Sequence, residues 1–147
     1  METTISKLNK HVEQLLKGIN EYESIEINSS LSQLLDMYSI PDEAKIACLT
    51  IDTSMRHLDA IGDNHLSKKA ILIGDLLSAH FYTLLANIQD STFQLTMSKA
   101  IVKINEDKSS INQNDLTDEE LKDAILDIEI LFPYLTCLLY TSDAADE

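Results

Sequence analysis

Apolar residues recur every three or four positions along most of the chain, which is the period of an amphipathic α-helix. The first such run predicts a helix over residues 4–22, with Thr3 or Thr4 as its cap. We expect residues 23–30 to connect it to a second, short helix, whose apolar positions are Leu31, Leu34, Leu35 and Tyr38. The opening part of the chain is therefore predicted to be helical with one break.

A third and a fourth helix are predicted next. Pro41 fits the first position of the third helix, because its missing N–H costs nothing there, and we expect this helix to end near Gly62. Residues 63–65 form a short polar break. Ser67 is then a suitable cap for a fourth helix over residues 68–88.

This fourth predicted helix is apolar on nearly every side. One face carries Gly74, Leu77, Ser78, Phe81, Tyr82 and Leu85. A second face carries Leu72, Leu76, Ala79, Thr83 and Ala86. A helix that is apolar all round has to be covered on two sides, so we predict that the chain's own core covers one and a partner chain covers the other.

The remaining sequence predicts two further helices. One covers residues 92–106, and residues 107–115 form the most loop-like stretch of the chain. Thr117 and Glu120 have the spacing of a capping box, which predicts the start of a last helix. Pro133 is expected to kink that helix.

Glycine and proline are rare, at 3 and 2 of 147 residues, which excludes an all-β fold because such folds need many tight turns. Phosphate-binding loops are excluded too, because Gly18, Gly62 and Gly74 lie too far apart. We therefore predict an all-α, single-domain helical bundle over residues 1–140. Residues 141–147 are interpreted as an acidic, flexible tail. Read-through into vector sequence is one interpretation of its origin, and native sequence is the other.

Cysteine content and hydropathy predict a cytoplasmic protein. The two cysteines, Cys48 and Cys137, are too few for a disulfide scaffold or a four-cysteine zinc site. The N-terminus lacks the apolar stretch of a signal peptide. The longest apolar stretch, residues 130–140, is too short to span a bilayer, so no membrane span is expected.

Charge and motifs exclude several classes of function. The net charge is −14, from 25 acidic and 11 basic residues, and Arg56 is the one arginine, which argues against binding nucleic acid. The zincin and serine-hydrolase motifs are absent, so no catalytic residue and no bound cofactor are expected. Asp59 and Asp63 are spaced to share a hard cation such as Mg²⁺, although two acids facing water is the simpler interpretation.

Two adjacent stretches, residues 57–63 (HLDAIGD) and 71–86 (ILIGDLLSAHFYTLLA), resemble consecutive helices of the trans-polyprenyl diphosphate synthases. In that all-α family the first helix ends in a DDxxD motif that holds Mg²⁺ on an allylic diphosphate. The next helix begins with an aliphatic run and Gly-Asp, and continues through small and aromatic residues into the subunit interface. Gly74-Asp75 and Ser78-Ala79 match this second pattern.

The first pattern is degenerate in this chain. Matching on His57 places the motif on residues 58–62, where Asp59 is the one acid that remains. Only 11 residues separate Asp63 from Asp75, so the basic segment that grips the diphosphate is missing. One carboxylate cannot assemble the metal cluster that draws off the leaving group, so we expect this chain to be inactive alone.

This chain is short, is predicted to be all-helical and lacks the intact motif. In these respects it resembles the small subunit, component I, of bacterial heterodimeric heptaprenyl and hexaprenyl diphosphate synthases. The resemblance implies an obligate large catalytic subunit that carries the Asp-rich motifs and Mg²⁺. That subunit would bind most of the allylic diphosphate and isopentenyl diphosphate, and the product would feed menaquinone side-chain synthesis. No metal or cofactor is expected on this chain, and Asp59 and Asp63 remain as a degenerate motif.

We hypothesise that the helix over residues 71–86 docks against the equivalent helix of the large subunit. Six residues are predicted to form this interface and part of a product tunnel that limits chain length: Gly74, Leu77, Ser78, Phe81, Tyr82 and Leu85. Two other functions stay open. One is an acidic helical adaptor or regulator unrelated to isoprenoid synthesis, and the other is a nucleic-acid mimic that occupies a basic protein groove.

Overall fold

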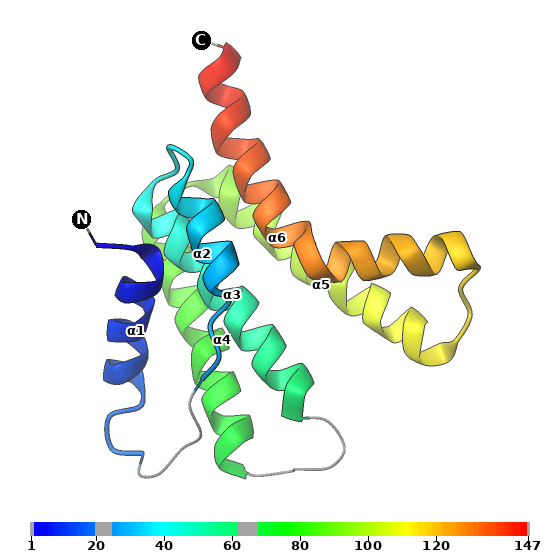
Figure 1. Ribbon diagram of the computed structural model, residues 1–147, viewed down its shortest axis with the longest axis horizontal. Coiled ribbons are helices and arrows are strands. Elements are labelled where there is room, and N and C mark those ends of the chain that lie inside the picture. Colours follow the sequence, from blue (N-terminus) through cyan, green and yellow to red (C-terminus); the bar gives the residue numbers. More distant parts are fainter. Residues whose placement is uncertain (1, 20–24, 62–67, 147) are drawn as a thin grey trace. The chain divides into compact units, whose positions relative to one another are not determined.

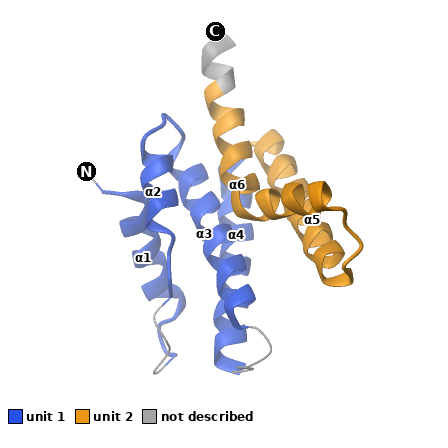
Figure 2. Cartoon of the chain, turned by 45° about the vertical axis from the view of Figure 1, so that its right-hand side comes forward, with its two compact units in different colours: residues 1–89 blue, residues 90–147 orange. Residues whose placement is uncertain are grey.

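The computed structural model describes residues 2–19, 25–61 and 68–146, with side chains up to residue 141. These residues form six helices and no strand, which confirms the prediction of an all-α fold (Figure 1). Their contacts group the chain into two compact units, residues 1–89 and 90–147 (Figure 2). The boundary between the units falls at Gln89, whose φ of 56° separates two helices. The assignment of residues 1–140 to one domain stays a prediction.

Unit 1 is built around one buried helix. Its elements are α1 (Thr4–Leu15), α2 (Ser29–Asp36), α3 (Asp42–Ile61) and α4 (Lys68–Ile88). Every residue from Ala44 to Ser54 is buried, and α1, α2 and α4 all pack against α3. Within this chain, α3 is therefore the helix that is covered on all sides, over residues 44–54. The predicted cover of residues 68–88 by a partner chain stays a prediction.

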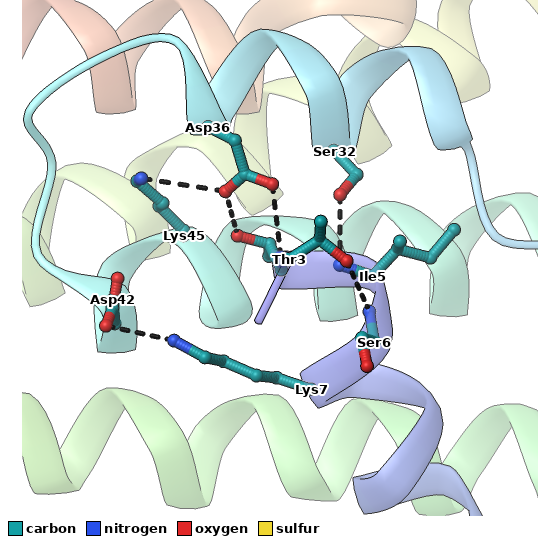
Figure 3. A network of polar contacts seen from close by, with 9 residues as sticks. Thr3, Ile5, Ser6, Lys7, Ser32, Asp36, Asp42 and Lys45 are labelled. Carbon is teal, nitrogen blue, oxygen red and sulfur yellow. Dashed lines mark hydrogen bonds and ion pairs between the residues drawn. The ribbon is translucent and has the colours of Figure 1, made fainter. Parts of the chain in front are cut away.

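Side chains of α2 cap the start of α1 (Figure 3). The Thr4 N–H and hydroxyl donate to the Asp36 carboxylate at 3.1 and 2.6 Å, and the Ile5 N–H donates to Ser32 Oγ at 2.9 Å. Lys45 from α3 reaches the same carboxylate at 3.6 Å. Free N–H groups at a helix start carry partial positive charge, so the Asp36 anion is stabilised where it lies.

The two ends of α1 differ in how well the sequence predicts them. Thr3 is the cap, as predicted, and its hydroxyl accepts from Ser6 N–H at 3.2 Å. The predicted end at residue 22 is wrong, because α1 ends at Leu15 and a turn leads to Gly18 at φ 99°. A left-handed backbone of this kind favours glycine and stops a helix.

Unit 2 consists of α5 (Ser91–Gln113) and α6 (Asp118–Asp146), which pack against each other. The capping box is confirmed: Thr117 N–H donates to Glu120 Oε1 at 3.0 Å, and Glu120 N–H donates to Thr117 Oγ1 at 3.2 Å. The core side chains are Phe93, Met97, Ala100 and Ile104 of α5 with Ala124, Phe132 and Thr136 of α6.

One prediction for unit 2 is wrong, and another stays a prediction. Residues 107–113 are helical and not a loop, because α5 continues until Asn114 adopts the left-handed conformation at φ 60°. Helix α6 runs to Asp146. The flexibility and the origin of the acidic tail stay predictions. Figure 1 shows that α6 is bent along its length. Pro133, where the sequence predicts a kink, lies inside this helix.

Candidate functional site

Helix α4 packs closely on α3 at Gly74. The Ser54 hydroxyl of α3 donates to the Gly74 carbonyl oxygen at 3.0 Å, and both residues are buried. A Cβ atom at Gly74 would lie 2.3 Å from Leu58 Cδ2, so only glycine fits this crossing without a shift. His57 Nε2 lies 2.9 Å from the Ala70 carbonyl oxygen, which ties the end of α3 to the start of α4.

The structure divides the six predicted interface residues between the inside and the outside of unit 1. Four are buried: Gly74, Leu77, Phe81 and Leu85. Ser78 is half-buried, and Tyr82 is 50% exposed. The four buried residues belong to the chain's own core, so Ser78 and Tyr82 are the members of this set that reach the surface, and the role of the set at an interface or tunnel stays a prediction.

The opposite side of α4 is exposed and mostly apolar. We define the outer face of α4 by the residues Ile71, Leu72, Asp75, Ala79, Tyr82, Thr83 and Ala86, all of them exposed. Leu72 is 49% and Ile71 38% exposed. The Thr83 hydroxyl bonds to the Ala79 carbonyl oxygen at 3.2 Å within the helix, so its polar group is already satisfied. Exposed apolar patches are often interaction sites, so the outer face of α4 is a candidate site.

Helical spacing separates the two faces of α4 but does not tell which one meets the core. The predicted partner face carries Gly74 and Leu77, and in the structure these two residues face the core. The packing of α3 distinguishes the two faces of α4. Residues 44–54 of α3 are buried on every side, so one face of α4 has to pack against them. Ile71 and Asp75 are the outer-face residues that belong to neither of the two predicted faces.

Comparison with known proteins identifies the family. The family model of the hexaprenyl diphosphate synthase small subunit, HexPS-like, matches residues 2–135. The chain belongs to this family. It is also similar to the crystal structure of heptaprenyl diphosphate synthase from Staphylococcus aureus, with a TM-score of 0.88 and 64% sequence identity over 92% of this chain and 72% of that chain. The resemblance to the small subunits of these prenyltransferases is thus confirmed.

The degenerate Asp-rich motif of this small-subunit chain is only partly described. Asp59 is exposed near the end of α3, while Gly62 and Asp63 lie outside the described residues. Within residues 2–19, 25–61 and 68–141, no three His, Cys, Asp or Glu side chains come close enough to hold a metal ion. Asp59 alone does not fit a Mg²⁺ cluster, and the absence of a metal on this chain stays a prediction.

Two described helices of this family member are long and apolar enough to cross a membrane by length and composition: α4 and the Asp118–Thr141 part of α6. Core helices of soluble proteins meet the same criterion, and the inner face of α4 is such a core face. These two helices therefore do not show a membrane protein. The absence of a membrane span stays a prediction.

Proposed function

We propose that this chain is the non-catalytic, obligate small subunit of a cytoplasmic, heterodimeric all-trans polyprenyl diphosphate synthase. It pairs with a large subunit that carries the Asp-rich motifs and Mg²⁺. That subunit extends an allylic diphosphate with isopentenyl diphosphate toward a menaquinone side chain. Membership in the small-subunit family and the 64% identity to a heptaprenyl diphosphate synthase chain support this proposal.

The outer face of α4 is the observation that carries the proposal. Small side chains at Ala79 and Ala86 let another helix approach closely, and Leu72 and Tyr82 flank them with apolar surface. Burying the exposed half of a leucine contributes about 1 kcal/mol, so several such side chains on one face add up to a stable contact. A helix of the large subunit with its own small and apolar face is the occupant.

The same placement supports a role of this chain in chain-length control. Phe81 is fully buried inside unit 1, whereas the Tyr82 ring stands on the outer face. The two rings contact each other edge to face, with centroids 5.2 Å apart. Tyr82 can therefore line a tunnel shared with the large subunit, and Phe81 supports it from behind.

The test mixes this chain with the large subunit and measures binding and elongation with labelled isopentenyl diphosphate. Ala79→Arg places a charge on the outer face, so we expect loss of copurification and at least about tenfold lower elongation, because an unpaired charge in an interface costs several kcal/mol. Val102→Arg is the matched control, because Val102 is exposed on α5 of unit 2.

Three results would contradict the proposal or part of it. Equal elongation by the large subunit with and without this chain contradicts the obligate role and favours the acidic adaptor. Full binding by Ala79→Arg contradicts the outer face as the contact. A product of unchanged length with Tyr82→Ala in the active heterodimer contradicts the tunnel role.

A further inference from the structure

Two histidines from distant parts of the sequence meet in unit 1. His11 Nδ1 on α1 lies 2.9 Å from His80 Nε2 on α4, and the two residues are 69 positions apart. The rings stand edge to face, with centroids 5.0 Å apart and an interplanar angle of 85°. Both side chains are half-buried, so they exchange protons with solvent but are partly shielded from it.

A nitrogen-to-nitrogen hydrogen bond depends on the protons that the two rings carry. One nitrogen has to bear a hydrogen, and the other has to offer a lone pair. The pair meets this condition with no added proton or with one. When both rings are protonated, every ring nitrogen is a donor, and two positive charges face each other at hydrogen-bond distance.

The charged groups on the surrounding helices do not neutralise a second proton. Charged side chains of α1, α2 and α3 form ion pairs with one another: Lys7 with Asp42, Lys45 with Asp36, and Arg56 with Asp52. The other acids on α1, α3 and α4 are exposed to solvent, namely Glu13, Glu43, Asp59 and Asp75. A carboxylate partner for the histidine pair is thus not seen among the described residues of these helices.

The distance also distinguishes a proton from a metal ion as the shared species. Two histidines on a tetrahedral metal, each about 2.0–2.1 Å from it, hold their nitrogens about 3.4 Å apart. The observed 2.9 Å is shorter than that and is an ordinary hydrogen-bond distance. The geometry therefore favours a shared proton.

We propose that His11 and His80 form a proton-operated latch, which fastens α1 to α4 near neutral pH and releases it when both imidazoles are protonated. Burial and the neighbouring His11 lower the pKa of His80, which is the direction that the latch requires. A histidine with a lowered folded-state pKa takes up its proton more readily when the contact is open. Its stabilising effect is complete above about pH 6.5 and is lost as the pH falls below that value.

The first experiment follows the histidine ring signals of the full chain by heteronuclear NMR between pH 8 and pH 5. We expect His80 to titrate below about 6.5, the ordinary value for histidine. His11→Asn keeps a polar group at the Nδ1 position but removes the second imidazole ring, so the midpoint of His80 should rise. His57→Gln is the matched control, because the His57 Nε2 bond is to a carbonyl oxygen and survives protonation.

The second experiment measures amide hydrogen exchange of α1 at pH 7.5 and pH 5.5, corrected for intrinsic rates. In the wild type, α1 should lose protection as the pH falls from the open-state midpoint of His80 to its folded-state midpoint. The loss should be about tenfold for each pH unit that separates these two midpoints. His80→Gln cannot titrate, so its α1 should keep the same protection at both pH values. An unchanged His80 midpoint in His11→Asn, or equal protection of wild-type α1 at both pH values, would overturn the latch.

Discussion

The crossing of α3 and α4 at Gly74 allows a sharp prediction about stability. In Gly74→Ala the new Cβ would meet Leu58 Cδ2 at 2.3 Å and Leu58 Cγ at 2.7 Å, with His57 Cδ2 at 3.3 Å. Carbon atoms do not approach to such distances, so Leu58 has to change rotamer or the helices have to separate. Rotation about the Cβ–Cγ bond of Leu58 moves Cδ2 but leaves Cγ in place, so this rotation alone does not relieve the overlap.

The magnitude follows from opposing effects. Overpacking of this kind costs about 1–3 kcal/mol. Alanine is the better helix former by about 1 kcal/mol, which offsets part of that cost. If the helices separate, the 3.0 Å bond from Ser54 to the Gly74 carbonyl also weakens, which adds about 1 kcal/mol. We therefore expect Gly74→Ala to lower the free energy of unfolding by about 1–2 kcal/mol.

The assay is urea unfolding followed by circular dichroism, applied to a double-mutant cycle. Leu58→Ala removes the atoms that the new Cβ meets, so the double variant should be more stable than the sum of the single changes by about 1–2 kcal/mol. Gly18→Ala is the control, because Gly18 has φ 99° and open space around its Cβ position. It should destabilise through backbone strain alone and show no coupling to Leu58.

The reasoning would be refuted by either of two results. If Gly74→Ala raises stability by the propensity difference, the helices are not in close contact there. If the effects of Gly74→Ala and Leu58→Ala are additive, the clash with Leu58 is not the cause of the loss.

Three further predictions concern charged and capping groups. Burial would raise the pKa of Asp36, but hydrogen bonds from Thr4 hold it below its ordinary value; Asp36→Asn should therefore lose about 1–2 kcal/mol at neutral pH, and the difference should vanish in urea titrations as the pH falls through the lowered pKa. Burial and a hydrogen bond with Asp107 raise the pKa of Asp127. The stabilising effect of that proton is present in acid and lost as pH rises, so Asp127→Asn should be more stable than the wild type at pH 7, and this advantage should shrink in thermal unfolding at pH 4. Thr117→Ala removes the cap of α6 and should cost about 1 kcal/mol in urea unfolding.

Local chemistry made several helix boundaries predictable. The bonds of the capping box join residues three apart, so the sequence alone locates the start of α6 at Thr117. The ends of α1 and α5 depend on single left-handed residues, Gly18 and Asn114, whose conformation is not visible in an apolar period. Capping of α1 by Asp36 joins positions 32 apart and was beyond any local pattern.

The candidate site was predictable as a helix but not as a set of contacts. Residues 71–86 stand out by their Gly-Asp step and their apolar character, and they lie in α4. Which side of α4 faces inward depends on α3, where even Lys45 and Asp52 are buried beside the apolar residues. Lys45 pairs with Asp36 of α2, and Asp52 pairs with Arg56 one turn further along α3. A period of apolar positions does not report such ion pairs.

The small residues of α4 therefore divide between two tasks that the sequence presents as one. Gly74 faces inward, where the absence of a side chain lets α3 approach closely enough for the Ser54 hydrogen bond. Ala79 and Ala86 face outward, where small side chains leave room for a helix of a partner. A bulky change at Gly74 should act first on the stability of this chain, and a bulky change at Ala79 should act first on association. Measuring folding and binding separately for the two variants tests whether each position serves the task proposed for it.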